Sequence, residues 1–217
     1  MIYEPGFEPI GHIYKDDNGN VVDGTTDMIS KELGLPSGKW LEPYATRGSY
    51  VDEACELYDN HDLNMDNCGM VVIKGSPCYV KDYIEQYKLA LAYHKIKVLQ
   101  NKIKRYSPLY GIAGELDKVC LIDNCVWVVD LKTTVKQFAH HKWQTAVYLE
   151  LIKDELTEKY PGMPQKRGCL YLTPISFELV EHAEENNFCE FRALHAAIKI
   201  KIANGYARKR TQVEWDL

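Results

Sequence analysis

The fold is decided by residues 111–134, which read GIAGELDKVCLIDNCVWVVDLKTT. Residues 112–122 alternate in part between apolar and polar side chains and end in β-forming residues. Asp123-Asn124 is typical of a tight turn. Residues 125–131 are an almost continuous apolar run, which predicts a strand buried on both faces. The stretch therefore predicts a β-hairpin whose second strand lies inside a sheet.

Two acidic residues are expected to face each other across this hairpin. A hairpin centred on the turn pairs Asp117 with Asp130, and Lys132 shares a strand face with Asp130. Carboxylates this close repel each other unless a cation or proton intervenes. With no Cys or His beside them, we expect Asp117 and Asp130 to hold Mg²⁺ or Mn²⁺. Lys132 would then orient a water and offset negative charge. A strand-end ion pair is the structural alternative for Asp130 and Lys132.

The rest of the chain supplies helices and further strands. The expected helices are 25–33, 48–58, 79–100, 137–156 and 186–203, and the expected strands are 12–14, 20–23, 169–173 and 177–182. Residues 60–76 read as mostly polar and turn-rich. This order of elements predicts an α/β sandwich with a central mixed sheet flanked by helices.

Length and composition indicate one globular domain over residues 1–217. Its expected parts are an N-terminal hairpin and helical part (1–105), a core (106–205) and a C-terminal tail (206–217). Of the 217 residues, 46% are apolar and 26% charged, which excludes disordered and fibrous classes. No apolar stretch approaches the roughly 20 residues of a membrane helix, and the N-terminus lacks a basic start and an apolar block. We therefore expect a cytoplasmic protein that does not contact membranes.

The seven cysteines are odd in number and form no CxxC pair. This pattern argues against a disulfide framework, a zinc ribbon and an iron–sulfur cluster. We expect reduced thiols and no iron–sulfur cofactor.

Charge is distributed unevenly along the chain. The net charge is −5, and residues 1–80 hold 5 Lys or Arg against 14 Asp or Glu. Residues 81–105 hold 7 Lys or Arg against 2 Asp or Glu. The asymmetry is compatible with a basic face for a polyanion beside an acidic metal centre. A solvated helix in an acidic protein is the alternative.

Three motifs stand together in the chain: a GxxD ending at Asp117, the Asp-x-Lys of Asp130 and Lys132 that closes a buried strand, and Gln144 on the next helix. Together they resemble the PD-(D/E)XK nuclease superfamily, in particular its RecB-type and phage exonuclease branch. The resemblance implies a restriction-endonuclease-like core. Asp117, Asp130 and the Leu131 backbone carbonyl would be metal ligands, and Lys132 the catalytic lysine. Gln144 would assist catalysis. Tyr148 would lie one turn after it, as in many members. The alternative for this pair is an exposed Gln and a Tyr at the edge of the core.

One segment departs from the family pattern. The segment from Arg47 ends in Asp52, where the family usually has a histidine that can ligate the metal. Asp52 and Glu56 share a helix face, so either could supply a third carboxylate, which would favour Mg²⁺ over Mn²⁺. Glu115, two residues before Asp117, is a further candidate ligand. An acidic exposed helix is the alternative for Asp52 and Glu56.

The resemblance also implies DNA as the partner, bound through its backbone rather than its base sequence. The candidate DNA-binding residues are Arg47, Ser49, Lys95, Lys97, Lys102, Arg105, Thr133, Gln144 and Tyr148. The implied activity is that of a deoxyribonuclease, and the resemblance favours an exonuclease over a restriction enzyme. Its implied role is in DNA recombination, repair or phage replication. Any helicase or recombination partner would be a separate chain, and the oligomeric state stays open. The alternative is a nuclease fold kept as a DNA-binding or protein-interaction module, because Asp52 replaces the histidine.

Overall fold

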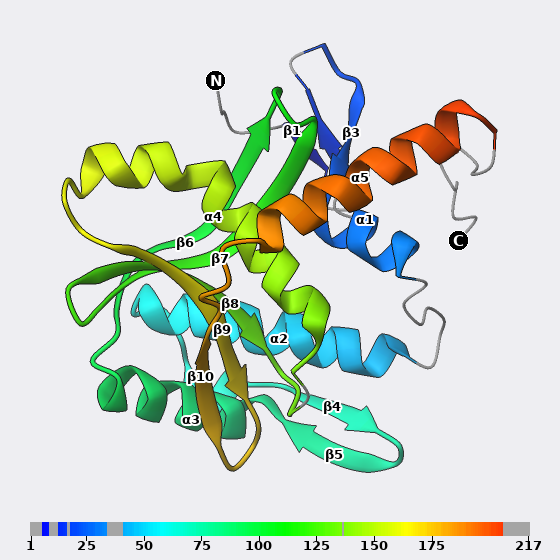
Figure 1. The fold of residues 1–217 in the computed structure, drawn as a ribbon. Helices are drawn as coiled ribbons and strands as arrows, with labels where there is room; N and C mark the ends of the chain where they lie inside the picture. The colour runs from blue at the N-terminus through cyan, green and yellow to red at the C-terminus, as the bar shows by residue number, and fades with distance from the viewer. Residues whose placement is uncertain (1–5, 9–12, 17, 34–40, 136, 206–217) are drawn as a thin grey trace.

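A mixed sheet forms the centre of the computed structural model, which describes residues 6–8, 13–16, 18–33, 41–135 and 137–205 (Figure 1). The eight strands of this sheet within those residues are β1 (Gly6–Glu8), β2 (Ile13–Lys15), β3 (Val21–Gly24), β6 (Lys97–Ser107), β7 (Ile112–Ile122), β8 (Cys125–Lys132), β9 (Gln165–Leu172) and β10 (Phe177–Glu181). Seven follow the order β1-β2-β3-β7-β8-β9-β10, and β6 pairs with β7 outside this path. The pairs β3–β7 and β8–β9 are parallel and the others antiparallel. The predicted α/β class, with a mixed sheet and an N-terminal hairpin, is confirmed.

Helices cover both faces of this sheet (Figure 1). They are α1 (Thr25–Glu32), α2 (Glu42–Asp59), α3 (Val80–Tyr93), α4 (Ala139–Lys159) and α5 (Asn187–Ala203). The apolar side chains of α1, α4 and α5 pack together on one face, and those of α2 and α3 pack on the other. A separate small hairpin, β4 (Met70–Ile73) and β5 (Ser76–Tyr79), connects α2 to α3.

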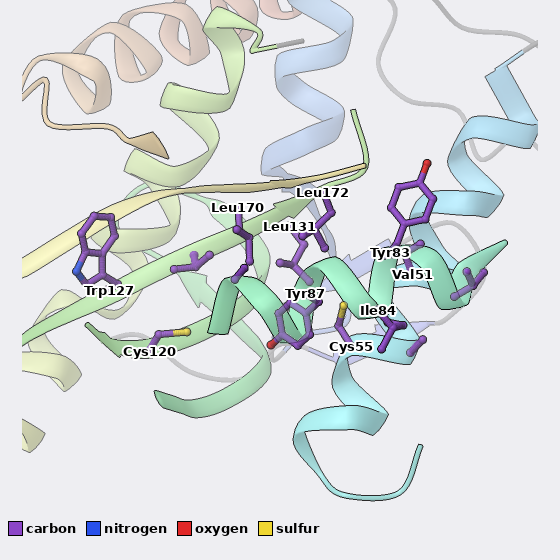
Figure 2. Packing of buried hydrophobic residues seen from close by; sticks show 14 of the residues in the cluster. Val51, Cys55, Tyr83, Ile84, Tyr87, Cys120, Trp127, Leu131, Leu170 and Leu172 are labelled. Atoms are coloured by element: carbon purple, nitrogen blue, oxygen red, sulfur yellow. The ribbon is translucent and has the colours of Figure 1, made fainter. Parts of the chain in front are cut away.

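The core beneath α2 and α3 is built from aliphatic, aromatic and cysteine side chains (Figure 2). The residues labelled there are Val51, Cys55, Tyr83, Ile84, Tyr87, Cys120, Trp127, Leu131, Leu170 and Leu172. Each is less than 9% exposed. Burial of this apolar surface holds α2 at a fixed position against the sheet.

The central hairpin forms with the predicted turn and register, but its ladder ends one pair before Asp117 and Asp130, which were expected to pair. Asp123 and Asn124 have φ values of 48° and 60°, the left-handed geometry of a two-residue hairpin turn. The strands then pair from Ile122 with Cys125 up to Lys118 with Val129. All but the first and last residues of β8 are buried, as expected for a strand between β7 and β9.

The helix predicted over residues 79–100 is confirmed as far as Tyr93 and wrong beyond it. The helix α3 ends at Tyr93, and the left-handed Lys95 (φ 51°) lets the Ile96 N–H bond to the Leu91 carbonyl. This bond closes the last helical turn in the manner of a Schellman motif. The chain then enters β6, where side chains of 97–107 alternate along a strand rather than around a helix.

This correction changes the interpretation of the basic segment 81–105. Its lysines and arginine do not share one helix face, because Lys97, Lys102 and Arg105 lie on β6 and Lys95 lies in the turn before it. The expected internal boundary after residue 105 falls inside β6, which pairs with β7 on both sides of that residue. In the described part of the chain, no helix has the length and apolar character needed to cross a bilayer.

Candidate active site

The strands β7 and β8 separate at the end of their ladder and form a fork. Their last paired residues are Lys118 and Val129. One edge of β7 pairs with β6, so β3 and β8 share the other edge. On that shared edge, β3 pairs only with Ile112 and Ala113. Residues 114–117 therefore have no strand partner on this edge among the described residues. The fork is a gap inside the sheet, lined by backbone and by the side chains at its rim.

Asp117 bridges the fork. Its Oδ2 accepts a hydrogen bond of 2.7 Å from the backbone N–H of Leu131, in place of the strand pairing that ends two residues earlier. In an extended strand the N–H and C=O of one residue point to the same edge. The Leu131 carbonyl is therefore expected to face the same side as its N–H, toward Asp117.

Asp130 lies at the centre of a hydrogen-bonded group on the other arm of the fork. It is only 1% exposed. Its carboxylate accepts from Lys132 Nζ at 2.5 Å, from Gln144 Nε2 at 3.1 Å and from the Cys169 thiol at 3.5 Å. Gln144 Nε2 also lies 2.9 Å from the Tyr148 hydroxyl. Gln144 and Tyr148 thus point into the site, as their spacing on one helix face predicts.

The position of Gln144 follows from the topology. Because β8 and β9 are parallel, the chain must cross over between them, and α4 makes this crossover. The helix begins seven residues after β8 ends and packs on the sheet at that point (Figure 1). Its second turn therefore brings Gln144 back over Asp130.

Burial and charge shift the ionisation of this group. Burial, together with the nearby Asp117 carboxylate, raises the pKa of Asp130 to about 6 against the lowering effect of Lys132. Burial alone would lower the pKa of Lys132, but Asp130 raises it above its usual value. Lys132 is therefore an ammonium at neutral pH. Burial and the Asp130 charge also raise the pKa of Tyr148, which stays a neutral phenol.

A second charged group adjoins the first through Asp117. Lys102 of β6 forms an ion pair with Asp52 of α2. The Lys102 Nζ also lies 3.7 Å from Glu115 Oε1 and 3.6 Å from Asp117 Oδ1. Carboxylates from two separate elements therefore surround one ammonium.

Both groups line a single cavity of about 450 Å³. The titratable acids and lysines on its wall are Asp27, Asp52, Glu115, Asp117, Asp130, Lys102 and Lys132. Of the other residues named from the sequence, Ser49, Leu131, Thr133, Gln144 and Tyr148 also line it. Sequence reasoning missed three contributors: Tyr14 and Asp27 on the wall, and Cys169 beneath Asp130. Cys169 lies directly beside Asp130 in the β8–β9 register, a pairing that no local sequence pattern reveals.

Other candidates lie away from the cavity. Glu56 is not among the residues that line it. Arg105 is ion-paired with Glu155 of α4, its Nη2 lying 2.8 Å from Oε2. Lys97 pairs with Leu121, four residues from Asp117 along β7, and Lys95 precedes the strand.

Arg47, for which DNA contact stays a prediction, ties α2 to the residue that follows β8. Its guanidinium donates to the Thr133 carbonyl and lies 5.5 Å and 5.7 Å from the ring centroids of Tyr44 and Tyr83. These contacts help hold Gly48 and Ser49 at the cavity wall.

The residues that line the cavity fit a hard divalent ion better than zinc. Among the described residues, its wall carries Asp and Glu side chains but no Cys or His. Across the described residues, no three His, Cys, Asp or Glu side chains converge as ligands around one point. Lysine ammonium groups instead contact the carboxylates. Asp117 and Asp130, on facing arms of the fork, are the pair whose mutual repulsion a cation would relieve.

Gly114 leaves room for Tyr148 beside β7. A Cβ atom at Gly114 would lie 2.8 Å from Tyr148 Cε1 and 3.2 Å from Leu151 Cδ1 and Thr25 Oγ1. We expect Gly114→Ala to displace Tyr148 and to lower the free energy of unfolding by about 1–3 kcal/mol, measured by urea denaturation. Gly69→Ala is the control, since a Cβ there meets nothing within 4 Å. Equal losses in the two variants would contradict the packing explanation.

Comparisons with known proteins give distant structural similarity only. Neither a protein-family model nor a curated protein matches the sequence. Among solved structures, a candidate exonuclease from Eubacterium rectale has a TM-score of 0.48 and 14% identity, covering 87% of this chain and 77% of that chain. The protein SSO0001 has a TM-score of 0.31 and 15% identity, covering 88% of each chain. Both similarities are too distant to indicate a function for this chain.

Proposed function

We propose that this chain is a divalent-metal-dependent deoxyribonuclease that hydrolyses phosphodiester bonds, acting as an exonuclease. The observation that carries the proposal is the meeting of Asp117 and Asp130 at the fork, with Lys132 and Gln144 both bonded to Asp130. A strand-end ion pair accounts for Lys132, but it does not account for the amide on the same carboxylate or for the second carboxylate across the gap.

The charge of the cavity supports a metal requirement. Five carboxylates and two lysines line it, so a phosphodiester would be repelled from the bare site. A bound Mg²⁺ or Mn²⁺ would supply Lewis-acid chemistry, by lowering the pKa of a water and by stabilising negative charge on the phosphate. Asp117, Asp130 and the Leu131 carbonyl would hold the ion.

The remaining residues have roles that follow from their contacts. Lys132 has three N–H donors and uses one on Asp130, so the others can orient a water or a phosphate oxygen. Gln144 fixes the Asp130 carboxylate and the Tyr148 hydroxyl relative to each other. Ser49 and Thr133 at the rim are positioned to contact the DNA backbone. The biological setting we propose is recombination, repair or phage replication.

Digestion of end-labelled DNA tests the proposal. Linear and closed circular DNA, single- and double-stranded, would be incubated with Mg²⁺ or Mn²⁺ and with wild type or Lys132→Met. We expect degradation of linear DNA only, reduced about 100-fold or more in the variant. Lys166→Met is the matched control, because Lys166 pairs with Glu181 at the surface of the sheet and its loss should leave activity unchanged.

Each alternative predicts a different result. Nicking of circles would make the protein an endonuclease. If wild type and Lys132→Met are equally inert on every substrate but still bind DNA, the catalytic proposal fails, and a DNA-binding module with a nuclease-like site becomes the better account.

A further inference from the structure

The ammonium of Lys102 lies among three carboxylates. It is ion-paired with Asp52, and its Nζ is 3.7 Å from Glu115 and 3.6 Å from Asp117. These acids come from α2 and β7, while the lysine comes from β6. A positive charge thus lies among carboxylates of two elements, beside the carboxylate that the proposed metal site also uses.

The backbone of β6 is distorted at this position. Lys102 has a φ of 51°, and among the described residues it is the one non-glycine residue with positive φ inside a strand. The others lie in turns or just after a helix. Lys102 faces Asp117 across the β6–β7 ladder, between the pairs Asn101–Lys118 and Ile103–Leu116. Left-handed geometry is unfavourable for a lysine, and it persists where the surroundings impose it. The position of this ammonium is therefore built into the sheet.

Charge balance indicates what the ammonium does. Asp27, Asp52, Glu115, Asp117 and Asp130 carry five negative charges, against one positive charge each on Lys102, Lys104 and Lys132. The balance of −2 is the charge that a single divalent ion would neutralise. Without Lys102, the carboxylates of Asp52, Glu115 and Asp117 would face one another with only Lys104, at the edge beside Glu115, as a neighbouring cation.

We propose that Lys102 is a resident cation that takes the place of a second metal ion, so that the site binds one divalent ion, between Asp117 and Asp130. This inference rests on the proposed function. Lys102 holds Asp52 and Glu115 together, which would otherwise repel each other. Lys102 is a positioning residue in this arrangement, because it acts through the carboxylates.

Metal binding in the absence of DNA tests this role. Isothermal titration with Mn²⁺ alone, checked by counting free Mn²⁺ by electron paramagnetic resonance, gives both stoichiometry and affinity. We expect one Mn²⁺ per chain in wild type. In Lys102→Met we expect two, with the tighter site gaining roughly ten-fold in affinity from the loss of a neighbouring positive charge. Lys102→Arg, which keeps the charge, should still bind one.

Lys104→Met is the matched control. Lys104 lies two residues further along β6, and its Nζ is 3.6 Å from Glu115 Oε2, so the variant makes the same change in charge at the edge of the cluster. It should bind one Mn²⁺ with affinity within about three-fold of wild type. One ion per chain in both Lys102→Met and wild type, at similar affinity, would overturn the proposal.

The same titration separates this inference from the function beneath it. If neither wild type nor Lys102→Met binds Mn²⁺, the metal-dependent function and the inference both fail. If both bind a single ion, the inference alone fails. Lys102→Gln is a second neutral variant for the case in which Lys102→Met does not fold. Thermal melting of each variant without metal shows which of the two is folded, and the titration is interpreted for the folded variant.

Discussion

Replacing Asp117 with Asn is expected to abolish DNA cleavage while leaving the fold intact. The amide oxygen of Asn can still accept the hydrogen bond from the Leu131 N–H, so the fork between β7 and β8 keeps its bridge. The charge that would hold a divalent ion against Asp130 is lost. We expect cleavage of linear DNA to fall about 1,000-fold or more, which is about 4 kcal/mol in the activation barrier.

Two measurements on Asp117→Asn separate a lost site from a lost fold. The melting temperature without metal should stay close to that of wild type, and the rise in melting temperature on adding Mg²⁺ should disappear. Glu56→Gln is the control, because this acid of α2 does not line the cavity and its variant should cleave at the wild-type rate. Full activity in Asp117→Asn, or equal losses in the two variants, would remove Asp117 from the mechanism.

The central hairpin could be predicted because its information is local. The two-residue turn sets the register, and the period of two along a strand decides which side chains share a face. These rules alone bring Asp117 and Asp130 to the same end of the hairpin, although the strands separate before the two residues pair. Gln144 and Tyr148 were predictable for the same reason, since the spacing on one helix face brings both toward the strand end that the helix follows.

The surroundings of Lys102 could not be predicted, because they depend on contacts between distant segments. Its sequence context is basic and has apolar residues at spacings that suit a helix, whereas the chain forms β6 once the Lys95 turn has closed α3. Only the pairing of β6 with β7 brings Lys102 beside Asp117, and only the docking of α2 brings Asp52 to it. A lysine expected at a DNA phosphate is therefore found among carboxylates.

Arg47 illustrates the same limit. The sequence motif put Arg47 in the segment that reaches the cavity, but it did not predict which groups Arg47 contacts. The Thr133 carbonyl and the rings of Tyr44 and Tyr83 come from segments on either side of it in the sequence. An arginine beside a candidate active site can position neighbouring elements or bind DNA, and the sequence alone does not distinguish the two roles.

The position of α2 at the cavity depends on a buried ion pair, and breaking it is expected to produce a large loss of stability. Lys118 Nζ lies 2.5 Å from Asp59 Oδ2, with the side chains 2% and 5% exposed. The Tyr87 hydroxyl also donates to Asp59, and Asn101 accepts from Lys118 at 2.8 Å. Lys118→Met would leave Asp59 buried without its counter-charge. We expect the free energy of unfolding to fall by about 3–5 kcal/mol, measured by urea denaturation.

Two further variants show whether the loss comes from an unpaired buried charge. In the double variant Lys118→Met/Asp59→Asn neither charge remains, and about half or more of the lost stability should return. Lys88→Met removes an equal charge from an exposed pair with Glu85 and should change stability by less than about 0.5 kcal/mol. Because Asp59 ends α2 two turns after Asp52, loosening this pair should also free the helix that brings Asp52 to Lys102. Equal effects in Lys118→Met and Lys88→Met would show that α2 is held by its apolar contacts alone.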